Sequence, residues 1–276
     1  MHVAWYVPIG FLVGTYGTLI GAGGGFILVP LLVLLFPEDA PSVVTAASLA
    51  IIFVNSASGT IAYARMKRIS YKTGILFALA TIPGALLGSW LSEFIPKKVF
   101  SAFFGALLVA VAAFLSVSRG MRARPRPPEG TGAKRRRIVD TVVDREGASH
   151  PLSYSVPLGM ALSLLIGLFS SLVGIGGGLF HVPILTYLFR FPVHVATATS
   201  HFILVFTSLA GVVEHILERT WPTHLLRDAC IALGVVGGAQ LGALLSRKIS
   251  APWIVVGLAI ALGIVGVRLV LSAILG

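Results

Sequence analysis

The sequence predicts an all-α polytopic membrane protein made of two homologous repeats, each with four apolar segments. Of its 276 residues, 56% are hydrophobic and only 11% are charged, and the mean hydropathy is +0.94, far from the balance of a soluble domain. Several windows of about 20 residues carry no charge, and this length crosses the hydrocarbon core of a bilayer. The two halves of the chain also match each other at a nearly constant spacing.

The apolar segments divide the chain into three parts. We expect an N-terminal transmembrane repeat over residues 1–118, a basic linker over 119–152 and a C-terminal transmembrane repeat over 153–276. The linker is polar, contains Pro and Gly and has no apolar periodicity, so we expect it to be flexible. The apolar segments run over residues 3–36, 42–64, 73–93, 98–118, 155–189, 193–216, 224–246 and 251–275.

The repeats are visible as identical residues whose offset drifts by one residue across loops, as expected after a duplication. The offset is 153 for Gly21, Gly23, Gly24, Gly25, Val29 and Pro30 against Gly174, Gly176, Gly177, Gly178, Val182 and Pro183. It is 152 for Thr45, Ala46, Ser48 and Gly59 against Thr197, Ala198, Ser200 and Gly211. It is 154 for Gly84, Ala85, Gly88 and Leu91 against Gly238, Ala239, Gly242 and Leu245.

The first segment of each repeat has a length that fits neither one span nor two. About 34 residues in a single helix would measure about 51 Å, and two full spans would need about 40 residues. A helix that breaks at the glycines and turns back fits, because glycine gives the backbone freedom to turn. The second piece then begins at Phe26 in the first repeat and at Leu179 in the second.

The direction of that second piece decides whether the repeats are inverted or parallel. If it returns to its own side, each half crosses the membrane an odd number of times and the repeats are inverted. With the linker in the cytoplasm, the inverted arrangement puts seven Lys and Arg inside and four outside, against six and five for the parallel one. The seven are Arg65, Lys67, Arg68, Lys72, Arg190, Arg247 and Lys248, and the four are Lys97, Lys98, Arg219 and Arg227. The charges favour inverted repeats.

The charge and cysteine content exclude several classes of protein. The net charge is +11, but nine of the 21 Lys and Arg lie in residues 119–150, which indicates topology and contact with anionic lipid rather than nucleic acid. Cys230 is the single cysteine, so no disulfide, metal site or cofactor is predicted. The sequence has no GxxxxGK[ST], HExxH or GxSxG motif, so we expect neither an ATPase nor another enzyme.

The broken helices predict an anion site. A helix that restarts inside the membrane presents unpaired N–H groups and a positive dipole end, and two such ends can converge between repeats. The alternative is that these glycines only allow close helix packing; packing needs four-residue spacing, which Gly84/Gly88 and Gly238/Gly242 have. The glycines we assign to the anion site are Gly23, Gly24, Gly25, Gly176, Gly177 and Gly178.

The motifs around the glycines resemble a known family. "GAGGGFILVPLLVLLF" followed by "VVTAASLAIIFVNS", repeated as "GIGGGLFHVPILTYLF" and "VATATSHFILVFTS", is similar to the TauE/SafE sulfite exporter family, also called the toluene sulfonate uptake permeases. The resemblance covers the whole chain outside the linker. It implies transport of small sulfur-containing anions such as sulfite, sulfonates or sulfoacetate across the bacterial inner membrane. The second repeat has the family-like Thr199 where the first has Ala47, so we expect an asymmetric site.

Polar side chains in apolar segments complete the predicted site. Ser48, Asn55, Thr199, Ser200, His201 and Gln240 are candidate donors to the anion, although hydrogen bonding between helices would also explain them. His201 and His181 have no counterpart in the first repeat. Because histidine titrates near neutral pH, they are candidates for proton coupling, and neutral packing is the alternative.

The function predicted is a secondary carrier that exports a small sulfur-containing anion by alternating access. An anion channel, or a carrier of other small organic anions such as carboxylates, is the alternative. The expected partners are the anion, the lipid bilayer, a coupling ion (H⁺ or Na⁺) and a second copy of the chain in a homodimer, with no nucleic acid. The expected location is the inner membrane, with the linker cytoplasmic.

Overall fold

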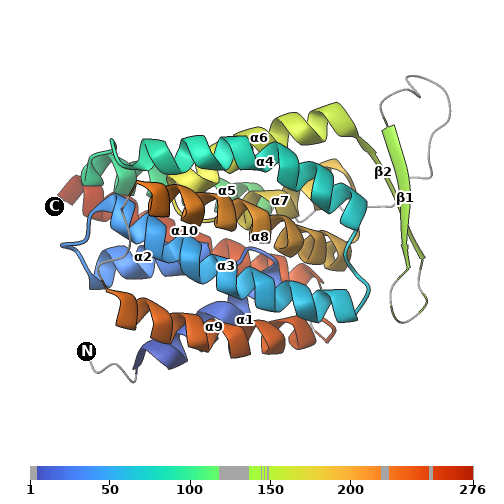
Figure 1. Cartoon of the computed structure of the whole chain (residues 1–276), viewed down its shortest axis with the longest axis horizontal. Helices are drawn as coiled ribbons and strands as arrows, with labels where there is room; N and C mark the ends of the chain where they lie inside the picture. The colour runs from blue at the N-terminus through green and yellow to red at the C-terminus, as the bar shows by residue number, and fades with distance from the viewer. Residues whose placement is uncertain are drawn as a thin grey trace.

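The computed structural model describes residues 5–117, 137–143, 145, 147, 149–218, 224–248 and 251–275. It is a bundle of helices with a two-stranded hairpin, β1 and β2, at one end (Figure 1). The first-half helices are α1 (Tyr6–Ile20), α2 (Gly25–Leu35), α3 (Pro41–Arg65), α4 (Tyr71–Ser92) and α5 (Lys97–Val117). After β1 (Arg137–Val143) and β2 (Ser149–Ser155) come α6 (Val156–Leu172), α7 (Gly178–Pro183), a π-helical segment (Ile184–Leu188), α8 (Val193–Leu217), α9 (Leu225–Leu245) and α10 (Ala251–Leu275).

The first apolar segment is a helical hairpin made of α1 and α2. Residues 21–24, here called the first glycine turn, connect the two helices, and Gly21, Gly23 and Gly24 have φ of 85°, 74° and 81°. A side chain disfavours this region of the backbone map, and glycine enters it freely. At the outer ends of the hairpin, the rings of Tyr6 and Phe36 have centroids 6.4 Å apart. The start of α1 and the end of α2 therefore lie at the same end of the bundle.

The corresponding segment of the second half is built in the same way. Residues 174–177, the second glycine turn, follow α6, and Gly174, Gly176 and Gly177 have φ of 77°, 76° and 95°. Tyr154 before α6 and Phe191 after the π-helical segment have ring centroids 5.8 Å apart. This hairpin differs from the first in its return arm, since α7 ends at Pro183 and a π-helical segment follows, whereas α2 continues past the corresponding Pro30 to Leu35.

Four helices are long and apolar enough to cross a membrane among the described residues, namely α3, α4, α8 and α9. At the centre of the bundle, α3 and α8 run antiparallel. A methyl group added at Gly59, late in α3, would lie 2.9 Å from Nε2 of His201, early in α8, and one at Gly211 would lie 2.6 Å from Cδ1 of Leu49. Helices α5 and α10 are also antiparallel, since Gly105 meets Val270 and Gly263 meets Ala112.

Small residues bring the hairpins close to the long helices, as their four-residue spacing predicts. A methyl group at Gly238 of α9 would lie 2.8 Å from the backbone nitrogen of Thr15 on α1, and one at Gly84 of α4 would lie 2.9 Å from that of Leu168 on α6. Thus α1 of the first half packs on α9 of the second, and α6 of the second half packs on α4 of the first. The packing assignment of these glycines is confirmed.

The linker differs from the expectation of a flexible segment. Its residues 119–136 lie outside the described part, but β1 and β2 pair antiparallel, with Arg137 opposite Ser155 and Val143 opposite Ser149. Val142, Leu152 and Tyr154 are buried in an apolar cluster with Phe77 and Phe189. The β-branched run at 138–143 suits a strand, and alternate residues cover the bundle. The expectation of flexibility was therefore wrong for the linker residues 137–143 and 149–152, which form strands.

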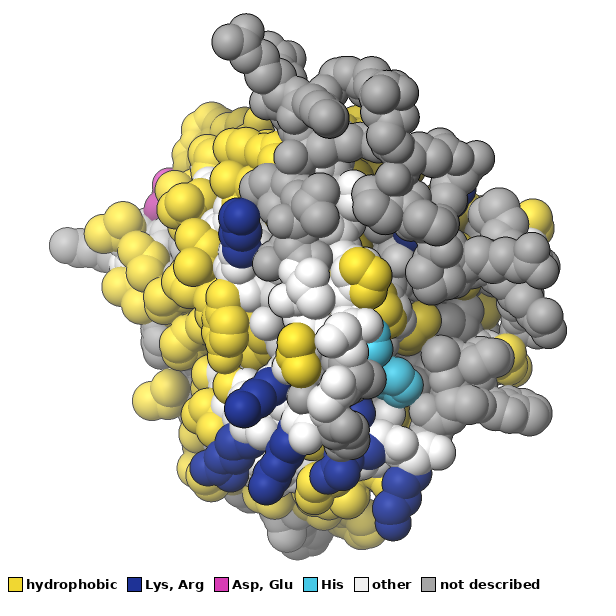
Figure 2. All heavy atoms as spheres, turned by 90° about the vertical axis from the view of Figure 1, so that its right-hand side faces the viewer, with side chains coloured by type: hydrophobic (Ala, Val, Ile, Leu, Met, Phe, Trp, Pro, Cys, Tyr) yellow, Lys and Arg dark blue, Asp and Glu magenta, His cyan; other side chains and the backbone are white. Residues whose placement is uncertain are grey.

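Charge separates the two ends of the bundle. We call the end that carries β1 and β2 the β end and the opposite end the acidic end. Basic side chains gather on the face at the β end (Figure 2), where α3 and α9 end and α4 and α8 begin. They are Arg65, Lys67, Arg68, Lys72, Arg145, Arg190, Arg247 and Lys248. The acidic end carries Glu38, Asp39, Glu93, Glu214, Glu218 and Asp228, which are all the acidic residues outside the linker.

Candidate functional site

The two glycine turns touch each other in the interior of the bundle. A methyl group at Gly25, where α2 begins, would lie 2.9 Å from the carbonyl oxygen of Ile175, and one at Gly178, where α7 begins, would lie 2.8 Å from Cα of Ala22. Residues 21–26 and 173–179 are buried. Each restarting helix therefore begins against the opposite glycine turn, and the helix starts lie one residue before those expected from the sequence.

Two apolar side chains wedge between the turns. Ile52 of α3 and Leu204 of α8 are both 0% exposed. A methyl group at Gly23 would lie 3.1 Å from Cγ2 of Ile52 and 2.9 Å from Cδ1 of Leu204, and one at Gly176 would lie 3.0 Å from the same Ile52 atom and 2.9 Å from Cδ2 of Leu204. Each side chain thus packs on both turns, and the two stand 152 positions apart, which is the offset of α3 against α8.

Ser48 and Ser200 cross-brace the turns. The Ser48 hydroxyl of α3 donates a 2.7 Å hydrogen bond to the carbonyl of Gly174, and the Ser200 hydroxyl of α8 donates one of 3.0 Å to the carbonyl of Gly21. Each serine therefore belongs to one half of the chain and holds the turn of the other half. Both candidate residues lie beside the glycines, as the sequence predicts.

A polar chain links the first glycine turn to His201. Asn55 donates from Nδ2 to the carbonyl of Gly23 at 3.0 Å, and Thr18 donates to Oδ1 of Asn55 at 3.3 Å. His201 Nε2 lies 3.1 Å from the Thr18 hydroxyl, and its Nδ1 is buried without a hydrogen-bond partner. Tyr63 closes the group, since its hydroxyl donates to the carbonyl of Thr18 at 2.7 Å.

The other three candidates lie apart from this polar chain. His181 on α7 places Nδ1 3.0 Å from the carbonyl of Gly177 and leaves Nε2 buried without a partner. The hydroxyl of Thr199 accepts a 3.1 Å hydrogen bond from the backbone N–H of Ser70, before α4. Gln240 donates to the carbonyl and hydroxyl of Ser58 at 2.8 and 2.9 Å. Thr199 and Gln240 therefore bind other helices and do not reach the turns.

Sequence reasoning missed the wedge residues and a pair of threonines. Thr45 and Thr197 correspond at the offset of 152, are 0% and 2% exposed and have hydroxyls without hydrogen-bond partners. Thr45 packs against Gly174 and Thr197 against Gly21. Their match between repeats was a signal of their position. Ile52 and Leu204 differ in identity and gave no such signal.

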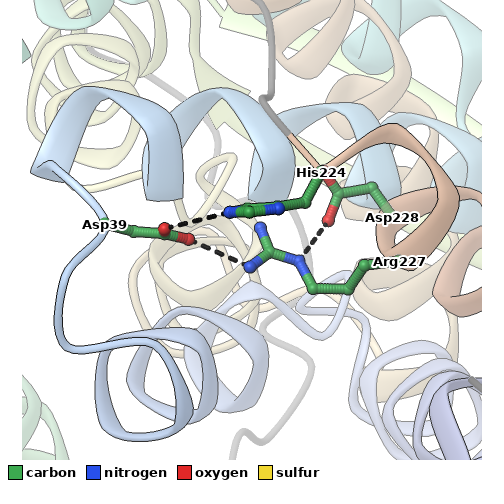
Figure 3. Close-up of polar contacts among 4 residues, drawn as sticks. All are labelled: Asp39, His224, Arg227 and Asp228. Carbon is green, nitrogen blue, oxygen red and sulfur yellow. Dashed lines mark hydrogen bonds and ion pairs between the residues drawn. The ribbon is translucent and has the colours of Figure 1, made fainter. Parts of the chain in front are cut away.

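A second polar cluster lies at the acidic end, where the α2–α3 connection meets α9 (Figure 3). Arg227, only 5% exposed, donates to Asp39 at 3.0 Å and to Asp228 at 2.9 Å. Its guanidinium carbon lies 4.3 Å from the ring centroid of Phe36, and His224 lies 3.5 Å from Asp39. The cluster joins the two halves of the chain at this end.

Two carboxyl groups also meet at the acidic end, where α4 and α8 finish. A hydrogen bond with Glu93 raises the pKa of the Glu218 carboxyl above its ordinary value, and burial and repulsion between the two groups act in the same direction. Among the described residues, no group of three or more His, Cys, Asp or Glu side chains is arranged to hold a metal ion. The two glycine turns, which touch each other in the interior of the bundle, and the residues that brace them are the candidate site.

Comparisons with known proteins found a family and relatives that match most of the chain. Residues 6–269 match the family described as sulfite exporter TauE/SafE. The chain is 33% identical over 274 residues to the probable membrane transporter protein YunE of Bacillus subtilis, with 97% of each chain covered. It is 26% identical over 281 residues to a probable membrane transporter protein of Methanocaldococcus jannaschii, with 96% of this chain and 94% of the relative covered. No solved structure matches the chain.

Proposed function

Since the chain belongs to the sulfite exporter TauE/SafE family, we propose that it exports small sulfur-containing anions of the sulfite, sulfonate or sulfoacetate type. The coarser statement needs no proposal, because the family and the relatives make it a multi-pass membrane transporter. The observation that carries the proposal is the meeting of two buried glycine turns, each followed by a helix that begins inside the bundle. Such helix starts bind anions through their N–H groups, so the site needs no buried Lys or Arg side chain.

The repeats in this proposal are inverted. Corresponding helices α3 and α8 are antiparallel, as are α5 and α10, and repeats related by an axis in the membrane plane place equivalent helices in opposite directions. Each half then contributes one helical hairpin that enters from its own side and one glycine turn at the centre. Alternating access consists of a movement of one half against the other around those turns.

The structure fits a closed state of this carrier. Ile52 and Leu204 fill the space between the turns, so an anion reaches the N–H groups that begin α2 and α7 only when the turns separate. Ser48 and Ser200 brace those turns from α3 and α8. The candidates Asn55 and His201 line the first turn and make the site asymmetric.

The proposal places the β end, with the linker, in the cytoplasm of a bacterial cell and the acidic end outside, because basic residues concentrate on the cytoplasmic side of inner-membrane proteins. Its partners are the anion, lipid, a coupling ion (H⁺ or Na⁺) and a second copy of the chain. An anion channel through the same turns and a carrier of small carboxylates are the competing functions, and the experiment below separates them.

Uptake of labelled sulfite and sulfoacetate by liposomes that contain the purified protein tests the proposal. We expect saturable uptake, which Ser48→Ala and Ser200→Ala each lower roughly 3- to 10-fold, the effect of one lost hydrogen bond. Ser116→Ala is the matched control, because Ser116 on α5 donates to the carbonyl of Ala112 in its own helix, and we expect unchanged uptake. A thermal-unfolding midpoint for each variant checks that it is folded.

Each alternative predicts a different result. Uptake that rises linearly with anion concentration would indicate a channel. Saturable uptake of a small dicarboxylate without uptake of sulfite or sulfoacetate would transfer the function to another class of anion. If the folded protein moves none of these probes, the proposed function is wrong and the glycine turns serve packing alone.

A further inference from the structure

The orientation of the Asn55 amide determines which nitrogen of His201 carries hydrogen. The Asn55 Nδ2 group faces the carbonyl of Gly23 at 3.0 Å, so its Oδ1 is left to accept a hydrogen bond. Thr18, 3.3 Å away, must therefore donate to Oδ1, and its hydroxyl oxygen is free to accept. His201 Nε2, 3.1 Å from that oxygen, is then the donor. In a neutral imidazole the other nitrogen, Nδ1, has no hydrogen.

The Nδ1 atom of His201 is thus a buried base without a donor. The side chain is 0% exposed, and Nδ1 has no hydrogen-bond partner. The ring faces Gly59 and Tyr63 of α3, Thr18 of α1 and the backbone of Gly21. Of these Tyr63 alone is titratable, and its hydroxyl is committed to the carbonyl of Thr18. No carboxylate is among these neighbours, so a proton on His201 would be a buried charge without a counter-ion.

From this geometry we propose that His201 carries one proton together with each transported anion, and that Nδ1 is the atom that takes it. The inference rests on the proposed function and names its coupling ion. The bound anion supplies the missing negative charge, so binding of the proton raises the affinity for the anion. Binding of the anion raises the affinity for the proton by the same factor. The protonated ring gains a second N–H donor at Nδ1.

The coupling is confined to the second half of the chain. At the offset of 152, His201 corresponds to Leu49, and Asn55 corresponds to Thr207, so the opposite turn has no equivalent base. One proton with one monovalent anion carries no net charge. Transport is then driven by the pH gradient and the anion gradient and does not respond to the membrane potential. An anion that accumulates inside the cell is exported by this route when its gradient exceeds the pH gradient.

The test uses methanesulfonate, a strong acid whose anion carries no proton of its own, in liposomes loaded with a pH-sensitive dye. For the wild-type protein we expect one proton to enter with each anion. The rate of uptake should be the same with and without a potassium diffusion potential. His201→Gln keeps an N–H for Thr18 but has no titratable group. We expect whatever anion this variant takes up to enter without acidification and with a clear response to the potential.

His181→Asn is the matched control, because His181 is also buried with one unpartnered nitrogen and asparagine keeps the N–H that faces Gly177. Because His181 contacts the second glycine turn at Gly177, the readout is the ratio of protons to anions and not the rate of uptake. We expect this variant to retain one proton per anion. A second measurement does not depend on whether a variant folds, because it uses the wild-type protein. It records nitrogen-15 spectra of protein with labelled histidine. Methanesulfonate should convert one buried Nε2–H imidazole into imidazolium, and an Nδ1–H tautomer for that histidine overturns the proposal.

The outcomes separate this inference from the proposed function. Anion uptake by the wild-type protein without proton entry, or proton entry retained in His201→Gln, contradicts the role of His201 and leaves the anion carrier intact. Loss of coupling in His181→Asn alone transfers the proton to the other histidine and contradicts the assignment. If the wild-type protein takes up no methanesulfonate, sulfite or sulfoacetate, the proposed function fails and this inference fails with it.

Discussion

At the scale of single residues, Ile52 and Leu204 are buried and pack against both glycine turns. Truncation to alanine removes apolar contacts with both turns and leaves a cavity, so we expect Ile52→Ala and Leu204→Ala each to lower the free energy of unfolding by roughly 2–5 kcal/mol. The thermal-unfolding midpoint in detergent measures this loss. Leu209→Ala, on the exposed side of α8 with 39% exposure, is the control.

The same two variants test the wedge as a barrier. If the side chains block the path between the turns, each alanine variant should let methanesulfonate leak into liposomes without saturation. A stability loss without a leak would show that the pair only fills space. Similar effects of the two substitutions are expected because Ile52 and Leu204 occupy corresponding positions, and a much larger effect of one would argue against that equivalence.

The sequence anticipates residues of the site only where chemistry marks them. Three consecutive glycines in an apolar segment, and a serine that recurs at one offset, stand out from their surroundings, and the structure places Ser48 and Ser200 beside the turns. An isoleucine in an apolar helix does not stand out. Thr199 shows the converse limit, since a hydroxyl at a suggestive position can face another helix and bond Ser70.

At the scale of elements, the cluster around Arg227 fastens the α2–α3 connection of one half to α9 of the other (Figure 3). Arg227→Met leaves the carboxylates of Asp39 and Asp228 buried without their cation. We expect it to lower the free energy of unfolding by roughly 3–5 kcal/mol and to expose residues 36–40 to protease. Thermal unfolding and limited proteolysis measure the two effects.

The triple variant Arg227→Met with Asp39→Asn and Asp228→Asn is the control for this prediction, because it removes the stranded charges as well as the guanidinium. It should recover much of the stability. If the single variant unfolds at the wild-type temperature, the cluster does not fasten the two halves. Arg227→Lys should rescue little, since an ammonium group cannot bond both carboxylates in the geometry of the guanidinium.

Element bounds followed well from the sequence because apolar length and charge mark where a span starts and stops. The expected segment 42–64 is α3 at Pro41–Arg65, and 193–216 is α8 at Val193–Leu217. The strands over 137–155 were missed because their burial depends on a surface that the bundle supplies. Val142 and Leu152 pack with Phe77 and Phe189, residues remote in the sequence, so local pattern could not reveal the hairpin.

At the scale of the whole molecule, helices pair across the halves. The contacts of α1 with α9 and of α6 with α4 exchange partners between the halves in the same way, and α3 packs on its counterpart α8. The main packing partners of α1, α6 and α3 therefore lie in the opposite half, and a movement of one half against the other must change these contacts. The sequence indicated the duplication through matched offsets, but which helices pair depends on packing between residues more than a hundred positions apart.

The charge difference between the ends predicts the orientation of the whole chain. In a Cys230→Ser background, we expect Glu38→Cys and Glu218→Cys, both exposed at the acidic end, to react with a membrane-impermeant maleimide in intact bacteria. Ser149→Cys and Arg190→Cys, exposed at the β end, should react only after permeabilisation, because the basic end stays in the cytoplasm.

Labelling of these four positions also tests the inverted repeats. Arg190 follows the second helical hairpin and Ser149 precedes it, so a hairpin that returns to its own side leaves both inside. If the position-190 cysteine reacts in intact cells while the position-149 cysteine does not, the second hairpin crosses the membrane and the inverted arrangement is wrong. If all four accessibilities are reversed, the inverted arrangement is retained, but the linker lies outside the cell. That orientation would contradict the rule that basic residues concentrate on the cytoplasmic side.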